Sequence, residues 1–314
     1  LEIRDCVIEY AYDKAVYAES GQSPWVHDNT IRNANYGVYG TVVTIEDNDF
    51  SSCGNHAVYL AGTATVDGNL ISGGGTGIRV ADGLIRNNTI TGGNSWGIYL
   101  TGNGTPTVTG NSITNNAYII YQGPGDPVYG GNSFSGNTNK VIGVGGTLAQ
   151  NGTWEDVQGL HMPYLVTSDV TIPAGVTLTI DPGVVVKFDA VDSSYSYDTS
   201  RHDLIIQGDL NLLSTASQRI VFTSSRDDTY GGDSNGDGTG SNPSGTNWGA
   251  LRYLNPDNVL HDAVVRYGGL GWQRDLSYGN VSDTQMVWAA GSAIGTLEIR
   301  DCVIEYAYDK AVYA

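Results

Sequence analysis

The sequence predicts an all-β fold, a parallel β-solenoid with three short strands in each coil. Two observations lead to this prediction. The first is a short pattern that recurs every 19 to 23 residues through 1–143. The second is an identical stretch of 18 residues, LEIRDCVIEYAYDKAVYA, which opens the chain at 1–18 and closes it at 297–314. Tandem repeats of about 20 residues are typical of solenoids, in which each coil packs only on its neighbours.

The first part of the pattern is Asp, Asn or Gly, then Asn, then a small or polar residue, then Ile or Phe. The Asn positions are Asn29, Asn48, Asn69, Asn88, Asn111 and Asn132, and Cys6 takes this place in 1–18. An inward side chain at a bend needs hydrogen-bond partners, and stacked amides can bond each other. We therefore expect a buried asparagine column beside an apolar column of Ile8, Ile31, Phe50, Ile71, Ile90, Ile113 and Phe134.

The second part of the pattern alternates with period 2, which indicates short strands with one face inward. Its examples are AVYA (15–18), GVYG (37–40), AVYL (57–60), GIRV (77–80), GIYL (97–100) and AYII (117–120). A further strand precedes each Asn. The outward third positions should form a surface stripe along the coils, made of Tyr17, Tyr39, Tyr59, Arg79 and Tyr99. Such a stripe can bind sugar rings or another filament. The alternative is that stacked tyrosines only stabilise the strands.

The second half of the chain has longer strand patterns that are richer in β-branched residues. We therefore expect coils with Asn-x-Ile repeats over 1–146 and coils with longer strands and a Gly/Asp-rich loop over 147–296. The segment 297–314 is expected to begin the next copy of the repeat.

Composition excludes several classes of partner. The chain has 15 Lys and Arg against 33 Asp and Glu, a net charge of −18, which argues against binding to nucleic acid or to an anionic membrane. No run of 18 apolar residues occurs, so we expect no membrane insertion within this segment. Of the three cysteines, Cys302 is the copy of Cys6, so a disulfide framework is not expected.

A Gly/Asp-rich loop at 224–245 is the candidate metal site. It contains D-x-N-x-D-G, the oxygen spacing of the first half of a calcium loop, and calcium prefers such hard oxygen ligands. The alternative is a solvated acidic insertion. The predicted calcium ligands are Asp227, Asp228, Asp233, Asn235 and Asp237.

We expect no enzyme activity and no catalytic residues. An enzyme of this kind needs carboxylates, or a carboxylate and a base, clustered on one face. Asp5, Asp28 and Asp47 share one column, but Gly and Asn replace them further along, which is typical of turn positions.

Several phrases resemble a known family. They are PYLVTSDVTIPAGVTLTIDPGVVVKF (163–188), IIQGDLNLLSTASQRIVFTSSRDD (205–228) and NWGALRY (247–253). Together they resemble the right-handed parallel β-helix repeat proteins of microbial cell surfaces, and the Asn-x-Ile coils look like the pectate-lyase-like β-helix repeat. The resemblance implies a right-handed parallel β-helix. It implies little about activity, because this fold hosts lyases, hydrolases, adhesins and stalks.

The identical coils at both ends predict uncapped ends. We therefore interpret the chain as one 296-residue period of a fibre in which further copies stack end to end, either within one long polypeptide or as separate chains. The predicted function is a structural unit of a secreted extracellular filament, stalk or adhesin-like fibre at the cell surface, stiffened by calcium and in contact with cell-surface polysaccharide. The alternative is a polysaccharide-binding or polysaccharide-cleaving β-helix protein of the pectate-lyase type.

Overall fold

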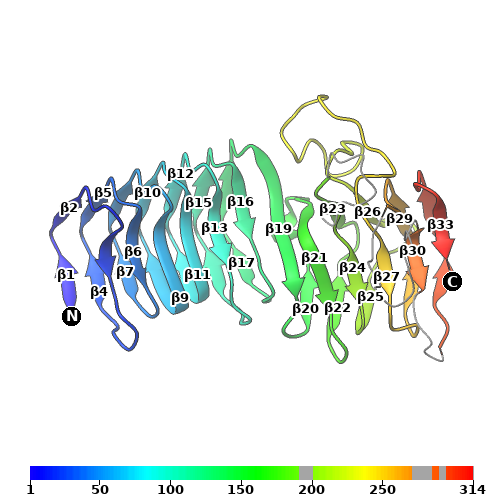
Figure 1. Ribbon diagram of the computed structural model, residues 1–314, viewed down its shortest axis with the longest axis horizontal. Coiled ribbons are helices and arrows are strands. Elements are labelled where there is room, and N and C mark those ends of the chain that lie inside the picture. Colours follow the sequence, from blue (N-terminus) through cyan, green and yellow to red (C-terminus); the bar gives the residue numbers. More distant parts are fainter. Residues whose placement is uncertain (191–200, 271–284, 290–294, 314) are drawn as a thin grey trace, which may run out of the picture. The chain divides into compact units, whose positions relative to one another are not determined.

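The computed structural model describes residues 1–190, 201–270, 285–289 and 295–313 (Figure 1). These residues form parallel strands and one short 3₁₀ helix, η1 at Val157–Gly159, and contain no α-helix. The predicted parallel β-solenoid is therefore confirmed. Contacts divide the chain into two units, 1–140 and 141–314, which are described separately. The expected boundaries after 146 and 296 stay predictions.

The first unit stacks its coils so that each strand pairs in parallel with the equivalent strand one coil later (Figure 1). Strands β9 and β11 bend and contribute to two columns. The first column consists of β1 (Glu2–Arg4), β4 (Trp25–His27), β7 (Thr44–Glu46), β9 (His56–Asp67), β11 (Thr76–Arg86), β14 (Thr107–Thr109) and β17 (Val128–Gly130). The second consists of β2 (Val7–Glu9), β5 (Thr30–Arg32), β8 (Asp49–Ser51), β10 (Leu70–Ser72), β12 (Thr89–Thr91), β15 (Ser112–Thr114) and β18 (Ser133–Ser135). The third consists of β3 (Lys14–Tyr17), β6 (Tyr36–Gly40), β9, β11, β13 (Trp96–Leu100) and β16 (Tyr118–Tyr121).

The core of this unit consists of like residues stacked on like residues. In the second column, Ile31 pairs with Phe50, and Ile71 pairs with Ile90, and all four are buried. Ile8 and Phe134 are only half-buried because β2 and β18 are the two ends of that sheet. The predicted apolar column is confirmed, and its burial is the main stabilising contribution along the coils.

The bend before each asparagine requires a left-handed backbone. Asp5, Asp28, Asp47 and Asn87 have φ between 53° and 55°. Asp, Asn and Gly tolerate this conformation better than other residues. These aspartates are therefore turn residues, as the sequence pattern predicts.

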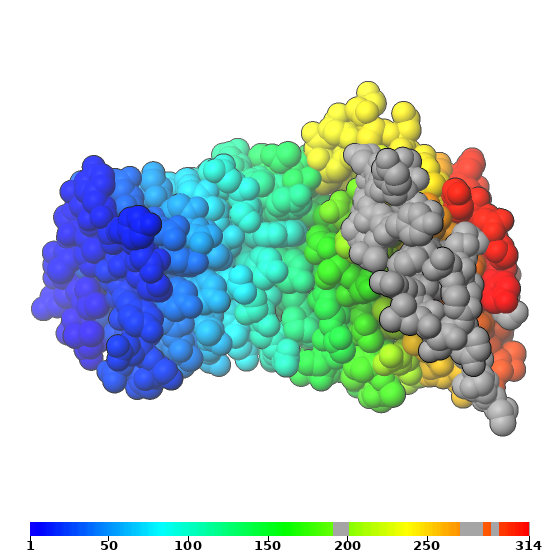
Figure 2. Space-filling model, viewed as in Figure 1, coloured from blue at the N-terminus to red at the C-terminus, as the bar shows by residue number. Residues whose placement is uncertain are grey.

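The second unit has longer strands and the same parallel pairing. One column pairs β21, β23, β26, β29 and β32, and another pairs β21, β24, β27, β30 and β33. The residues after β26 form a loop that stands out from the surface (Figure 2, yellow). The strands are β19 (Asn139–Thr147), β20 (Gly152–Trp154), β21 (Tyr164–Ile172), β22 (Thr177–Ile180), β23 (Val185–Phe188), β24 (Leu204–Ile206), β25 (Asp209–Leu212), β26 (Ile220–Ser224), β27 (Leu251–Tyr253), β28 (Val259–His261), β29 (Ala263–Arg266), β30 (Gln285–Ala289), β31 (Glu298–Arg300), β32 (Val303–Glu305) and β33 (Lys310–Tyr313).

The two copies of the 18-residue stretch fold in the same way. Strands β1, β2 and β3 recur, residue for residue, as β31, β32 and β33. The first copy pairs with the coil that follows it, and the second copy pairs with the coil that precedes it. Within the described ranges, the strands of each copy therefore pair on one edge only.

Candidate functional site

The buried asparagines form a hydrogen-bonded ladder inside the first unit. The side-chain amide of Asn48 donates to Oδ1 of Asn69 at 3.0 Å and to the carbonyl oxygens of Val26 and Glu46 at 2.9 and 2.8 Å. The same contacts connect Asn29 through to Asn132. The predicted column is confirmed. Its amide groups are used within the fold, so the ladder is structural.

The predicted tyrosine stripe is continuous. Strand pairing places its members on successive coils, and the rings of Tyr39 and Tyr59 stack at 4.6 Å between centroids with planes 3° apart. The guanidinium group of Arg79 lies between the rings of Tyr59 and Tyr99, at 4.9 and 5.1 Å. Because the faces of Tyr39, Tyr59 and Tyr99 lie against neighbouring groups of the stripe, this part of it offers ring edges and hydroxyl groups to a partner.

The stripe extends one residue beyond the sequence prediction. Tyr121 pairs with Tyr99 and stacks on it at 4.2 Å. The alignment of AYII (117–120) with GIYL (97–100) was wrong by two residues, because Ile120 takes the register position of Ile98 and the phrase that matches GIYL is IIYQ (119–122).

A second column, which the sequence interpretation missed, lies beside the stripe. Tyr36 stacks on His56 at 5.5 Å, and Trp96 stacks on Tyr118 at 4.4 Å. The two columns meet edge to face, as in the 5.3 Å contact of Tyr36 with Tyr39. Burial, helped by the charge of Arg79, lowers the pKa of His56 to about 4, so its ring is neutral. We call the two columns together the aromatic surface. Its members are Lys14, Tyr17, Tyr36, Tyr39, His56, Tyr59, Arg79, Trp96, Tyr99, Tyr118 and Tyr121.

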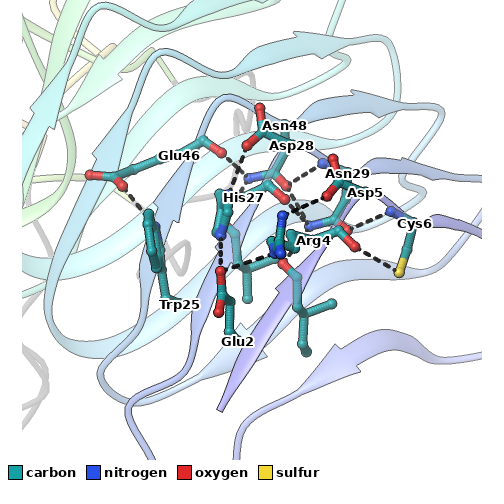
Figure 3. Close-up of polar contacts among 12 residues, drawn as sticks. Glu2, Arg4, Asp5, Cys6, Trp25, His27, Asp28, Asn29, Glu46 and Asn48 are labelled. Atoms are coloured by element: carbon teal, nitrogen blue, oxygen red, sulfur yellow. Dashed lines mark hydrogen bonds and ion pairs between the residues drawn. The ribbon is translucent and has the colours of Figure 1, made fainter.

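A polar network ties the first three coils together through β4 (Figure 3). His27 bonds Glu2 of the preceding coil through Nε2 at 3.0 Å and Asp28 through Nδ1 at 2.7 Å. Trp25 stacks on His27 at 3.9 Å and donates from Nε1 to Glu46 of the next coil at 2.7 Å. The hydrogen bond to Asp28, and then that to Glu2, raise the pKa of His27 above its ordinary value. When protonated, the ring is a charged link between coils.

The predicted calcium ligands do not form one cluster. Asp227 is buried and accepts a hydrogen bond from Thr223 at 2.7 Å, and Arg266 lies 3.6 Å away. Asp233 accepts backbone N–H groups of its own loop, including that of Gly236 at 2.8 Å, and Asn235 donates to Asp237 at 3.0 Å. Within the described part of the chain, no three or more His, Cys, Asp or Glu side chains are arranged to hold a metal ion.

A buried cation lies beneath the same loop. The ammonium group of Lys187 donates to the carbonyl of Gly232 at 2.7 Å, and burial lowers its pKa to about 8 although Asp228 and Asp227 oppose that shift. Two buried oxygen atoms of the loop, Oδ1 of Asp228 and Oγ of Ser234, have no hydrogen-bond partner among the described residues. Calcium binding here stays a prediction.

A hollow of about 290 Å³ opens in the second unit where β25 and β28 do not pair. Charged side chains line it, and two of them, His261 and Arg300, bond to neighbouring groups. His261 contacts Asp262 at 3.1 Å and the carbonyl of Leu212 at 3.1 Å, and Arg300 contacts Glu298 at 2.9 Å.

The fold and these surfaces define a β-solenoid repeat protein. A family model described as periplasmic copper-binding protein (NosD) matches residues 1–164, just over half of the 314 residues, and the chain belongs to this family. Comparison with curated proteins and comparison with solved structures each gave no match. In the described part of the chain, no helix is long and apolar enough to cross a bilayer.

Among the described residues of the matched segment, no group of three or more His, Cys, Asp or Glu side chains is arranged to hold a metal ion. Copper favours imidazole, thiolate and thioether ligands. Both ring nitrogens of His27 are bonded to carboxylates, and burial raises the pKa of the Cys53 thiol to about 11, which keeps it protonated. His161 and Met162 line a small cavity of about 110 Å³, but they are only two donors, and Nδ1 of His161 contacts Asp156 at 2.7 Å.

Proposed function

We propose that the chain is a structural period of a β-solenoid fibre that lies outside the cytoplasm and extends by adding coils. The family description names periplasmic proteins, which supports a location outside the cytoplasm. A position at the cell surface, as a filament, stalk or adhesin-like fibre, is the more specific form of this proposal.

The observation that carries the proposal is the repeated coil. The 18 residues at each end have the same strands, and Asp5 and Tyr10 share their left-handed backbone with Asp301 and Tyr306. Coils of a solenoid contact only their neighbours, so a coil with one open edge can accept another.

Electron microscopy of the protein isolated from its source tests the function. We expect rods longer than one unit, with an axial repeat that corresponds to one 296-residue period. Single particles the size of one unit, at every concentration and in the presence of calcium, would contradict the proposal.

Binding of polysaccharide is a second candidate function, favoured by the aromatic surface. Tyr59 and Tyr99 flank Arg79, which supplies hydrogen-bond donors beside two hydroxyl groups. Calorimetry with cell-wall polysaccharide tests this function. We expect weaker binding for Arg79→Ala and unchanged binding for Tyr12→Ala, because Tyr12 is fully exposed and lies outside the aromatic surface. Equal binding by both variants would reject the candidate.

A further inference from the structure

The two copies of the repeated coil are covered on opposite edges. Val16 is 6% exposed because β6 lies beside β3, whereas Val312, the same position in the second copy, is 44% exposed. An open strand edge and its apolar side chains favour pairing with a further strand. We therefore expect the edge formed by β31, β32 and β33 to pair with further strands. The contacts of the first copy show which kind of segment fits against this edge.

Charges on the repeated coil match neighbours on both sides. Glu305 forms an ion pair with Arg266 of the preceding coil, at 3.2 Å. Its twin Glu9 forms an ion pair with Arg32 of the following coil, at 2.5 Å. A glutamate at this position is thus complementary to an arginine on either edge.

Aromatic side chains match in the same way. Tyr313 pairs in register with Trp288 of the preceding coil. Its twin Tyr17 pairs with Tyr39 of the following coil, with ring centroids 5.9 Å apart. The tyrosine of the repeated coil therefore has an aromatic neighbour in register on either edge, in the preceding coil and in the following coil.

The following coil also supplies the asparagine that the repeated coil lacks. Asn29 donates to the carbonyl oxygen of Ile3 at 2.9 Å and accepts the backbone N–H of Cys6 at 3.1 Å. The same two backbone groups recur at Ile299 and Cys302 on the open edge. A segment with an asparagine at that position would satisfy them.

A second chain stacked by its own first coil fits less well. The parallel register seen throughout the fold would place Glu9 on Glu305, Lys14 on Lys310 and Arg4 on Arg300. Like charges directly opposite each other on neighbouring strands are destabilising. Cys6 would also take the place of the ladder asparagine.

We infer that the open edge of 297–314 binds a segment with the sequence of residues 19–40, and that it does not bind the 1–18 coil of another chain. This inference rests on the proposed fibre function and specifies its form, in which successive periods continue one strand path. The partner is a second copy of this repeat, entered at residue 19.

Two tandem chains test the inference. The first consists of residues 1–314 followed by 19–314, and its matched control consists of 1–314 followed by 1–314, which adds one more 1–18 coil. Amide hydrogen exchange at 310–313 reports whether the edge is covered. We expect at least tenfold slower exchange in the first tandem chain than in the 1–314 chain, and little slowing in the control.

A charge variant refines the test. In the first tandem chain, Arg32→Glu in the second copy alone should restore fast exchange at the junction, because it faces Glu305 in that position. The same substitution in the first copy should leave exchange at 310–313 unchanged. Equal slowing in the tandem chain and its control, or an unaffected junction in the charge variant, would overturn the inference.

The behaviour of the 1–314 chain separates the two proposals. If it associates end to end and protects both 1–18 and 297–314 from exchange, the inference is wrong and the fibre function stands. If neither tandem chain protects 310–313 and the 1–314 chain stays monomeric, the fibre function fails as well.

Discussion

The amide of Asn48 donates to the side-chain oxygen of Asn69 one coil later, and Asn69 makes the same bond to Asn88, each at 3.0 Å. Both bonds lie in the interior, where an unpaired amide is costly. Each asparagine thus depends on the next coil for an acceptor of its amide and on the preceding coil for the donors that satisfy its oxygen. The asparagine ladder therefore favours a neighbouring coil that carries an asparagine at the same position.

Replacement of one ladder residue should destabilise the first unit strongly. Asn69→Ala removes donors to Ile45 and Asp67 and leaves the backbone N–H of Asn48 without its acceptor. Several buried groups at about 1–3 kcal/mol each give an expected loss of about 3 kcal/mol or more in urea unfolding. Asn103→Ala, at an exposed position, should stay within about 0.5 kcal/mol. Similar losses for the two variants would show that the ladder contributes little.

Arg79 and Tyr59 should be energetically coupled. A double-mutant cycle with Arg79→Gln and Tyr59→Leu is expected to give a coupling of about 0.5–1 kcal/mol, the range for an exposed cation over a ring. A cycle of Arg79 with Tyr17, which lies three coils away, should give none. A coupling energy of zero in the first cycle would show that the contact between Arg79 and the Tyr59 ring does not contribute to stability.

His27 should make the attachment of the first coil depend on pH. The pKa of His27 is raised in the folded chain, first by the hydrogen bond to Asp28 and then by that to Glu2. Because the pKa is raised by folding, the protonated ring stabilises the folded chain, and this contribution is fully present below the ordinary pKa of 6.5. The contribution is lost as the pH rises through the pKa of the folded chain. The groups that face the ring are Glu2, Asp28 and the stacked Trp25.

The variant His27→Gln measures this contribution. The stability difference between wild type and His27→Gln in urea unfolding should be larger at pH 5.5 than at pH 9, which lie about one unit below and about two and a half units above the ordinary pKa. His161→Gln is the control, because His161 is exposed. A difference that stays constant across this range would contradict the role of the imidazolium.

Calcium should raise the thermal stability of the second unit if the 224–245 loop binds it. Oδ1 of Asp228 and Oγ of Ser234 lack partners, and a bound cation would supply one. We expect a lower melting temperature after chelation, and no response to chelation in Asp233→Asn/Asp237→Asn. Asp257→Asn, at an exposed position outside the loop, should respond like wild type. An unchanged melting curve of the wild-type chain on chelation would count against the site.

The fold could be predicted from the sequence because it repeats. A residue such as Asn69 or Ile71 recurs at fixed spacing, and stacking requires like residues at like positions. The side chains at the edges of the pattern could not be placed. Tyr36, His56, Trp96 and Tyr118 begin the phrases YGVY, HAVY, WGIY and YIIY, three residues before the stripe. The alignment began one residue too late to include the first three, and it placed the phrase of Tyr118 two residues too early.

The acidic loop shows the limit of local spacing. D-x-N-x-D-G predicts oxygen atoms close in sequence, but whether they meet depends on what lies beneath the loop. Here Lys187, which is 45 residues from its partner Gly232, occupies that region with its own charge. A local sequence pattern cannot predict a contact between residues so far apart in the chain.

The intact mass of the polypeptide, measured by mass spectrometry on protein isolated from its source, is the most direct test of a continuous array of periods. The account predicts a chain several times larger than 33.3 kDa that contains more than one 296-residue period. A single species close to 33.3 kDa would contradict it.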